Sequence, residues 1–209
     1  MLRIIGLTGG IACGKSHVSQ VLQSAGVPVV DGDQLSRGLT APGGAALADI
    51  HAVFGPQVFN PDGTLDRKAL GRLVFHDAAE LDQLNRLMRP LLRRAIDEAL
   101  ASLERSGERL CVMDMPLLYE EGLDRLCSRV WCVHLSRETQ LNRLMERDHC
   151  TPEEALDRIN SQMPVDEKAA RADVVISTEG SLEETRQKVL RLWQDELELL
   201  QREEESHGT

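Results

Sequence analysis

The chain has 209 residues, of which 42% are hydrophobic and 28% charged, as in ordinary soluble globular proteins. Its formal net charge of −10 argues against binding nucleic acid through a broad basic surface, although basic groups can still converge on a phosphate in one cleft. No stretch is long and uncharged enough to span a bilayer, and the N-terminus lacks a signal-peptide pattern. Five scattered cysteines indicate reduced thiols. We expect a cytoplasmic protein with no nucleic-acid or membrane partner, and its oligomeric state stays open.

Five short apolar runs predict β-strands. Because these runs are apolar throughout instead of alternating, the strands are expected to be covered on both faces. Helical patterns separate them, as at 16–25, which is followed by Gly26, a natural helix stop. Alternating strands and helices predict an α/β fold with a parallel sheet. In chain order the five runs are 3–7, 27–30, 110–113, 130–135 and 173–176.

The segment 9–16 fits the phosphate-loop pattern G-x-x-x-x-G-K-[ST], between a predicted strand and a predicted helix. Its glycines let backbone N–H groups point at phosphate oxygens, and the helix start adds its positive end. Lys15 can reach the β- and γ-phosphates, and the Ser16 hydroxyl can bind Mg²⁺. No N-K-x-D element for guanine is present, which favours a kinase over a GTPase. The predicted ATP site comprises Gly10, Ile11, Ala12, Cys13, Gly14, Lys15, Ser16 and His17.

Asp33 follows the second predicted strand, at the edge of the sheet where the phosphate loop also lies. Phosphoryl transfer to a hydroxyl needs a proton acceptor, and Mg²⁺ needs oxygen ligands. Asp33 fits either role. The alternative is that its side chain caps the next helix.

Residues 34–107 contain no clear strand, and their apolar residues have helical spacing on both sides of a turn at Asn60–Gly63. We predict an inserted helical domain here, and a nucleotide-binding core formed by 1–33 and 108–209. The position of the insertion suits a substrate-holding module, but helical packing alone would also explain the periodicity.

Two further groups of charged residues follow. Asp114 ends the apolar run 110–113, as in a Walker-B strand, and is a candidate for the Mg²⁺ shell. A charged helical stretch over 138–162 carries Arg143 and Arg147 four residues apart, hence on one helix face. Two guanidiniums there could clamp the transferring phosphoryl group as a lid closes. The alternative is a solvent-exposed charged face on which Arg143 pairs with Glu146, or Arg147 pairs with Glu146 and Asp148.

Taken together, these motifs resemble those of the dephospho-coenzyme A kinase family over nearly the whole chain. The double glycine after Leu7-Thr8 is more distinctive than a generic phosphate loop. The matching elements are Gly6–Ser16, Asp31–Asp33, Pro61–Arg67, Pro116–Glu120 and Arg158–Gln162 with Ala172–Ile176.

The resemblance implies transfer of the ATP γ-phosphate to the ribose 3′-hydroxyl of dephospho-coenzyme A, with Mg²⁺. It implies a P-loop NTPase-type parallel five-stranded sheet flanked by helices, an inserted helical coenzyme A domain and a helical lid at 138–165. It makes Asp33 the catalytic base and Lys15 a phosphate ligand, with Arg143 and Arg147 as lid arginines. The expected acceptor contacts are Asp33, Pro116, Leu117, Leu118 and Glu120. The alternatives are a kinase for another nucleoside, nucleotide or small metabolite, and an ATP-binding regulatory module.

Four positions depart from the family pattern. Cys13 stands where a small residue is usual, which predicts a loop sensitive to thiol oxidation. His17 replaces Thr or Val, and Arg89 replaces a common His. Ser177-Thr178 replaces a frequent Asp-Asn, which puts adenine contacts there in doubt.

Overall fold

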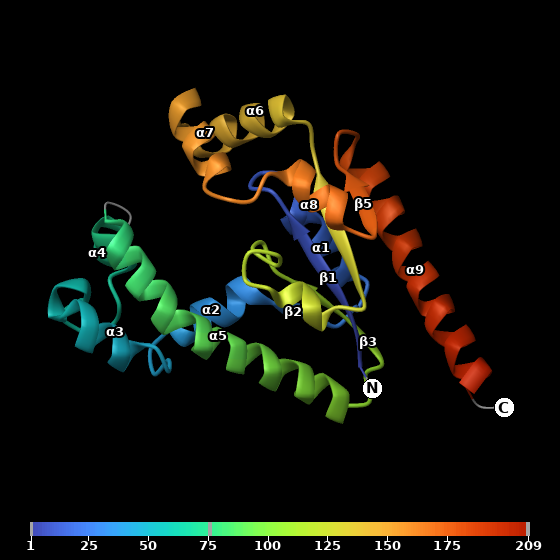
Figure 1. Ribbon diagram of the computed structural model, residues 1–209, viewed down its shortest axis with the longest axis horizontal. Helices are drawn as coiled ribbons and strands as arrows, with labels where there is room; N and C mark the ends of the chain where they lie inside the picture. Colours follow the sequence, from blue (N-terminus) through green and yellow to red (C-terminus); the bar gives the residue numbers. More distant parts are fainter. Residues whose placement is uncertain (1, 75–76, 208–209) are drawn as a thin grey trace. The chain divides into compact units, whose positions relative to one another are not determined.

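A computed structural model describes residues 2–74 and 77–207. The chain forms two compact units (Figure 1). The core unit comprises Met1–Val30 and Leu103–Thr209, and the helical unit comprises Asp31–Ser102. Within the described ranges, no helix combines the length and the apolarity that a membrane span requires.

The core unit is built on a five-stranded sheet with the order β2-β3-β1-β4-β5. The β1–β3, β1–β4 and β4–β5 pairings are all parallel. Every residue of β3 and the last five residues of β1 are buried, because helices and loops cover both faces of the sheet. The predicted α/β fold with a parallel five-stranded sheet is confirmed. The strands are β1 (Arg3–Gly9), β2 (Val29–Asp31), β3 (Leu110–Asp114), β4 (Arg129–His134) and β5 (Val174–Ser177).

Helices surround this sheet (Figure 1). Helix α8 packs on β1 and β4, whereas α1 packs on the long C-terminal helix α9. Their apolar side chains meet those of the strands in one cluster that includes Leu7, Leu22 and Trp131. The helices of this unit are α1 (Lys15–Ser24), the 3-10 turn η2 (Leu123–Leu126), α6 (Arg137–Asp148), α7 (Pro152–Asn160), α8 (Val165–Arg171) and α9 (Leu182–His207).

The prediction of one helical stretch over 138–162 is wrong, because the chain forms two helices there, α6 and α7. The helix α6 ends at Asp148, and its C-cap residue His149 has a left-handed φ of 50°. Thr151 then starts α7 with a capping box. Its side chain accepts from the Glu154 backbone N–H, and the Glu154 side chain accepts from the Thr151 backbone N–H. Pro152 at the first helical position fits a new helix start. The sequence signal for this break is therefore Thr-Pro-x-Glu.

The helical unit has a small apolar core of its own, centred on Ile50, Phe54 and Leu70. The predicted turn at Asn60–Gly63 is present: the Gly63 N–H donates to the Asn60 carbonyl at 2.9 Å, and Gly63 has a φ of 80°. The helix α5 continues through Pro90. The helices are α2 (Gly32–Leu39), α3 (Leu47–Phe54), the 3-10 turn η1 (Pro56–Val58), α4 (Arg67–Val74) and α5 (Ala78–Arg105), whose last residues belong to the core unit.

The family-like segment Pro61–Arg67 organises this unit internally. The Thr64 hydroxyl donates to the Asp62 carboxylate at 2.6 Å, and this hydrogen bond lowers the pKa of Asp62. Asp66 accepts from two N–H groups of the first turn of α4 and thereby caps that helix. Arg67 donates to the Thr40 hydroxyl at 2.6 Å, which ties α4 to the end of α2. The segment therefore has a structural role within the unit.

Candidate active site

The phosphate loop links the end of β1 at Gly9 to the start of α1 at Lys15. Gly14 precedes the helix with a φ of 86°, a left-handed conformation that favours glycine. The helix has no side-chain cap and no acidic residue in its first turn. Its first N–H groups and its positive dipole end are therefore available to an anion, as the motif predicts.

Three side chains from distant segments hold this loop in place. Gln140 in α6 donates from Nε2 to the Ile11 carbonyl at 2.8 Å, and Gln162 Oε1 accepts from the Ile11 N–H at 3.2 Å. Thr178, after β5, donates to the Cys13 carbonyl at 2.8 Å. Sequence reasoning missed the role of Gln140, since a glutamine in a charged helical pattern gives no signal of burial.

Glycine at position 10 allows the loop to approach α6 closely. A Cβ atom at this position would lie 2.6 Å from Gln140 Nε2 and 3.0 Å from Cys13 Sγ. The same atom would lie 3.2 Å from the Cβ of Val165, the first residue of α8. The loop is therefore packed closely against α6 and against the start of α8.

Lys15 and Asp114, predicted independently from two motifs, meet in the structure. Lys15 Nζ lies 2.6 Å from Asp114 Oδ1, and the two side chains are 13% and 4% exposed. The parallel pairing of β1 with β3 places Asp114 opposite Leu7, two residues before the loop. A mostly buried ion pair thus joins the phosphate loop to the end of β3.

The donor set at this edge fits Mg²⁺ bound together with a nucleotide. The ion is usually held by one or two carboxylates plus substrate phosphates, and it keeps several waters. Asp114 provides a carboxylate, and the exposed Ser16 hydroxyl lies next to Lys15 in the chain. Over residues 2–74 and 77–207, no group of three or more His, Cys, Asp or Glu side chains is placed to hold a metal without such phosphates.

The two arginines of α6 have different partners. Arg143 Nη2 donates to the Thr178 carbonyl at 2.9 Å. Thr178 in turn donates from its hydroxyl to the Cys13 carbonyl, so it connects Arg143 to the phosphate loop. Arg147 forms two hydrogen bonds with Asp148, at 2.7 and 3.0 Å. This pair raises the pKa of Arg147 and lowers that of Asp148. Arg147 is 55% exposed, and its pairing with Asp148 matches the alternative of a solvent-exposed charged face.

The loop after β3, residues 116–120, combines buried and exposed groups. Leu118 is fully buried, and the exposed fraction of Leu117 is 37%. The Pro116 carbonyl accepts from the Thr8 hydroxyl at 3.1 Å. The Glu120 carboxylate accepts from the Met163 N–H at 3.1 Å and lies 2.8 Å from the ammonium of Lys168. Sequence reasoning missed Lys168 entirely.

Asp33 lies in the first turn of α2, in the helical unit. The cap of this helix is Asp31, whose Oδ1 accepts from the Gln34 N–H at 3.0 Å. The alternative role considered for Asp33, capping, therefore belongs to Asp31. Among the described residues the exposed carboxylate of Asp33 makes no hydrogen bond or ion pair.

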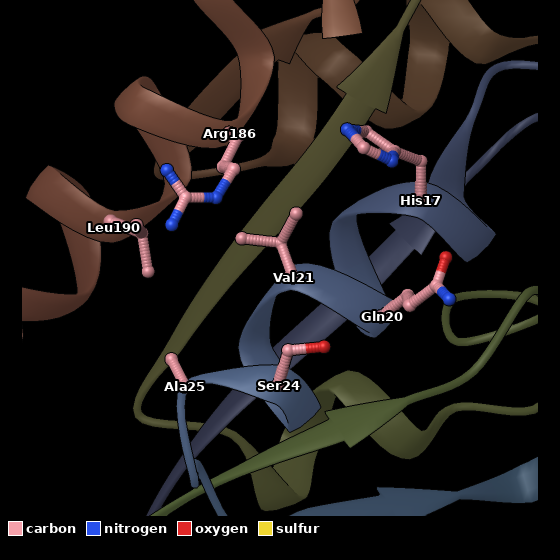
Figure 2. A pocket seen from close by; sticks show the side chains of 7 residues that line it. All are labelled: His17, Gln20, Val21, Ser24, Ala25, Arg186 and Leu190. Atoms are coloured by element: carbon pink, nitrogen blue, oxygen red, sulfur yellow. The ribbon is translucent and has the colours of Figure 1, made fainter. Parts of the chain in front are cut away.

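His17 borders an open hollow of about 240 Å³ between α1 and α9 (Figure 2). Its Nε2 lies 3.1 Å from the Leu182 carbonyl and must carry the proton, since a carbonyl only accepts. Figure 2 shows Gln20 and Ser24 on the α1 side, with Arg186 and Leu190 on α9. The His17 side chain thus links the phosphate-loop helix to the start of α9.

Cys13 is fully buried, against the expectation of an oxidation-sensitive loop. Burial raises the pKa of its thiol to about 11, because the buried site disfavours the charged thiolate. The thiolate is the reactive form of cysteine. The structure therefore predicts a loop that resists thiol oxidation.

Comparisons with known proteins extend over most of the chain. The family described as Dephospho-CoA kinase matches residues 3–184. A dephospho-CoA kinase of Shouchella clausii is 46% identical over 185 residues, which cover 88% of this chain and 94% of the relative. One from Anaeromyxobacter dehalogenans is 47% identical over 194 residues, which cover 93% and 92%.

Solved structures show the same likeness. A Thermus thermophilus protein, TT1252, has a TM-score of 0.79 at 36% identity, covering 94% of this chain and 98% of its own. A dephospho-CoA kinase from Campylobacter jejuni has a TM-score of 0.73 at 26% identity, covering 93% and 97%. Because the family matches residues 3–184 and a relative is 46% identical over 88% of the chain, the chain belongs to the dephospho-CoA kinase family.

Proposed function

We propose that this protein transfers the γ-phosphate of ATP to the ribose 3′-hydroxyl of dephospho-coenzyme A, the final step of coenzyme A synthesis. The observation that carries the proposal is the family match over residues 3–184, which includes the phosphate loop, Asp33 and the 116–120 loop. The predicted cytoplasmic location and lack of nucleic-acid partners stay predictions.

The proposed ATP site is the loop from Gly10 to His17. Its N–H groups and the start of α1 would hold the phosphates. The Lys15 ammonium would contact the β- and γ-phosphates, either by leaving Asp114 or by lying between Asp114 and the phosphates. Asp114 and Ser16 would hold Mg²⁺, which neutralises phosphate charge when bound. The short Lys15–Asp114 contact supports this assignment, because it places both groups at one edge of the sheet.

The proposed chemistry at the acceptor begins with Asp33. Its carboxylate would accept the proton of the attacking hydroxyl as the oxygen bonds to phosphorus. Arg143 and Arg147, in the proposed lid 138–165, would stabilise charge on the transferring phosphoryl group. The predicted contacts to dephospho-coenzyme A in the core unit are Pro116, Leu117, Leu118 and Glu120, and the helical unit is the proposed coenzyme A domain. Leu118 would contribute through its backbone, since its side chain is buried.

A product assay tests this function directly. The protein is incubated with ATP and Mg²⁺ and with one acceptor at a time: dephospho-coenzyme A, AMP, CMP or shikimate. We expect ADP and coenzyme A to form together with the first acceptor only, and omission of Mg²⁺ to abolish the reaction. Turnover of AMP without turnover of dephospho-coenzyme A would contradict the proposal, and ATP binding without any product would favour a regulatory role.

Arg147→Ala is expected to lower kcat by about 10- to 100-fold, which corresponds to the roughly 1.5–3 kcal/mol of a hydrogen bond to a charged group. The affinity for ATP should change less, because a lid arginine acts mainly on charge that develops in the transition state. Steady-state kinetics with both substrates, together with ATP titration by calorimetry, measures the two effects.

Arg137→Ala is the matched control for this variant. Arg137 lies on the same helix and donates to Asn160 at 2.7 Å, so its loss removes an arginine and a link between α6 and α7. We expect kcat to stay near the unaltered value. Equal losses of rate and of ATP affinity in Arg147→Ala would instead indicate ground-state binding.

A further inference from the structure

Lys168 in α8 is a charged side chain with no exposed surface. Its ammonium donates to the Pro116 carbonyl at 2.7 Å and lies 2.8 Å from Glu120 Oε1. Removing an ammonium and a carboxylate from water costs free energy that their attraction repays only in part. Apolar side chains of similar volume often stabilise a fold equally well at such a place. The charged pair therefore calls for a role besides stability.

The partners of Lys168 lie at both ends of the 116–120 loop. At its start, the Pro116 carbonyl accepts a second hydrogen bond, from the hydroxyl of Thr8 in β1. At its end, Glu120 Oε1 also accepts from the Met163 N–H. Glu120 Oε2 is buried with no hydrogen-bond partner among the described residues, so the pair is not arranged for maximal stability.

The same contacts lead on to the phosphate loop. Met163 follows Gln162, whose side chain accepts from the Ile11 N–H. Thr8 is the residue before Gly9, where the loop begins. Lys168 thus stands where three segments meet: the 116–120 loop, the chain leaving α7, and the root of the phosphate loop. A shift of the 116–120 loop or of the chain leaving α7 would break a hydrogen bond to Lys168 or Glu120. A shift of Thr8 would break its hydrogen bond to the Pro116 carbonyl, which Lys168 also contacts.

We propose that Lys168 and Glu120 are positioning residues that fix the 116–120 loop against the segment Gln162–Met163 and so set the binding of the phosphate acceptor. The inference rests on the proposed function, in which this loop contacts dephospho-coenzyme A. This assignment replaces the direct acceptor contact predicted for Glu120, because its carboxylate is held by Lys168 and by the Met163 N–H. Its effect on the acceptor is then indirect. The phosphate loop keeps its separate ties to Gln140 and Thr178, so ATP binding is left intact.

Lys168→Met tests this assignment through the separate Michaelis constants of the two substrates. We expect the KM for dephospho-coenzyme A to rise by about 10- to 100-fold, the scale of a misplacement near 1 Å at a reacting centre. The KM for ATP should change less than threefold, an expectation that follows from the intact phosphate-loop contacts. Glu167→Gln, on the same helix and 55% exposed, should leave both constants unchanged.

The double variant Lys168→Met/Glu120→Met separates positioning from stability. Without either charge, the thermal midpoint should recover relative to Lys168→Met, because no lone buried charge remains. The KM for dephospho-coenzyme A should stay raised, since the Lys168 hydrogen bond to Pro116 is still missing and the Glu120 hydrogen bond to Met163 is now lost as well. Recovery of that KM together with the thermal midpoint would overturn the proposal, as would equal rises in both KM values. An unaltered protein that fails to phosphorylate dephospho-coenzyme A would instead contradict the proposed function.

Discussion

Asp33→Asn is expected to lower kcat by about 10²–10⁴-fold, the usual contribution of a general base. The amide keeps the shape of the carboxylate but cannot take the proton of the attacking hydroxyl. Stability should change little, because Asp31 caps α2 and the Asp33 carboxylate makes no hydrogen bond or ion pair with other described residues. Saturating both substrates isolates kcat, and an ATP titration shows whether the nucleotide affinity is preserved.

Asp31→Asn provides a control two residues away with the same chemical change. Asparagine caps a helix about as well as aspartate, so the amide should keep the hydrogen bond to the Gln34 N–H. We expect a kcat close to that of the unaltered protein. An unchanged kcat in Asp33→Asn would remove Asp33 from the chemistry. Equal losses in both variants would assign the effect to the negative charge of the segment instead of to proton transfer.

The strands could be predicted because burial on both faces leaves a continuous apolar run in the sequence. Their ends could not, since pairing decides where a strand begins. The apolar run 27–30 predicts Val27 in the second strand, but its N–H donates back to the Leu22 carbonyl near the end of α1, and β2 begins at Val29. The run 173–176 predicts Asp173 in the last strand, yet its carboxylate accepts from the Val130 N–H at 2.7 Å, and β5 begins one residue later.

Short sequence motifs predict most residues of the candidate site. The side chains that support these residues give no signal in the sequence. The meeting of Lys15 and Asp114 follows from two strand ends at one edge of a parallel sheet. Lys168 and Glu196 gave no such signal, because a charged residue in a helical pattern normally faces water. Both are buried, and each pairs across the fold, Lys168 with Glu120 and Glu196 with Arg129. Such pairing depends on tertiary packing that periodicity does not encode.

Lys15→Met is expected to lower kcat/KM by about 10²–10³-fold, the typical cost of removing one preorganised group that stabilises transition-state charge. The ammonium is the proposed contact to the β- and γ-phosphates, and methionine keeps the length of the side chain without the charge. Because Lys15 Nζ lies 2.6 Å from Asp114 Oδ1, the free energy of unfolding should also fall, by about 1.5–3 kcal/mol for a hydrogen bond between charged groups. ATP should raise the thermal midpoint of the variant less than that of the unaltered protein.

Two further variants separate the catalytic loss from the structural one. Lys15→Met/Asp114→Asn leaves no carboxylate beside the missing ammonium, so part of the stability should return while the activity stays low. Lys188→Met removes a partly buried lysine that donates to the Val175 carbonyl, and it should keep full activity. If the double variant regained activity together with stability, Lys15 would act through its pair with Asp114 alone. Continued inactivity in a stable double variant is expected, because that variant lacks both the proposed phosphate contact and the proposed Mg²⁺ carboxylate. The smaller rise in thermal midpoint that ATP gives to Lys15→Met is the result that places the Lys15 ammonium on the phosphates.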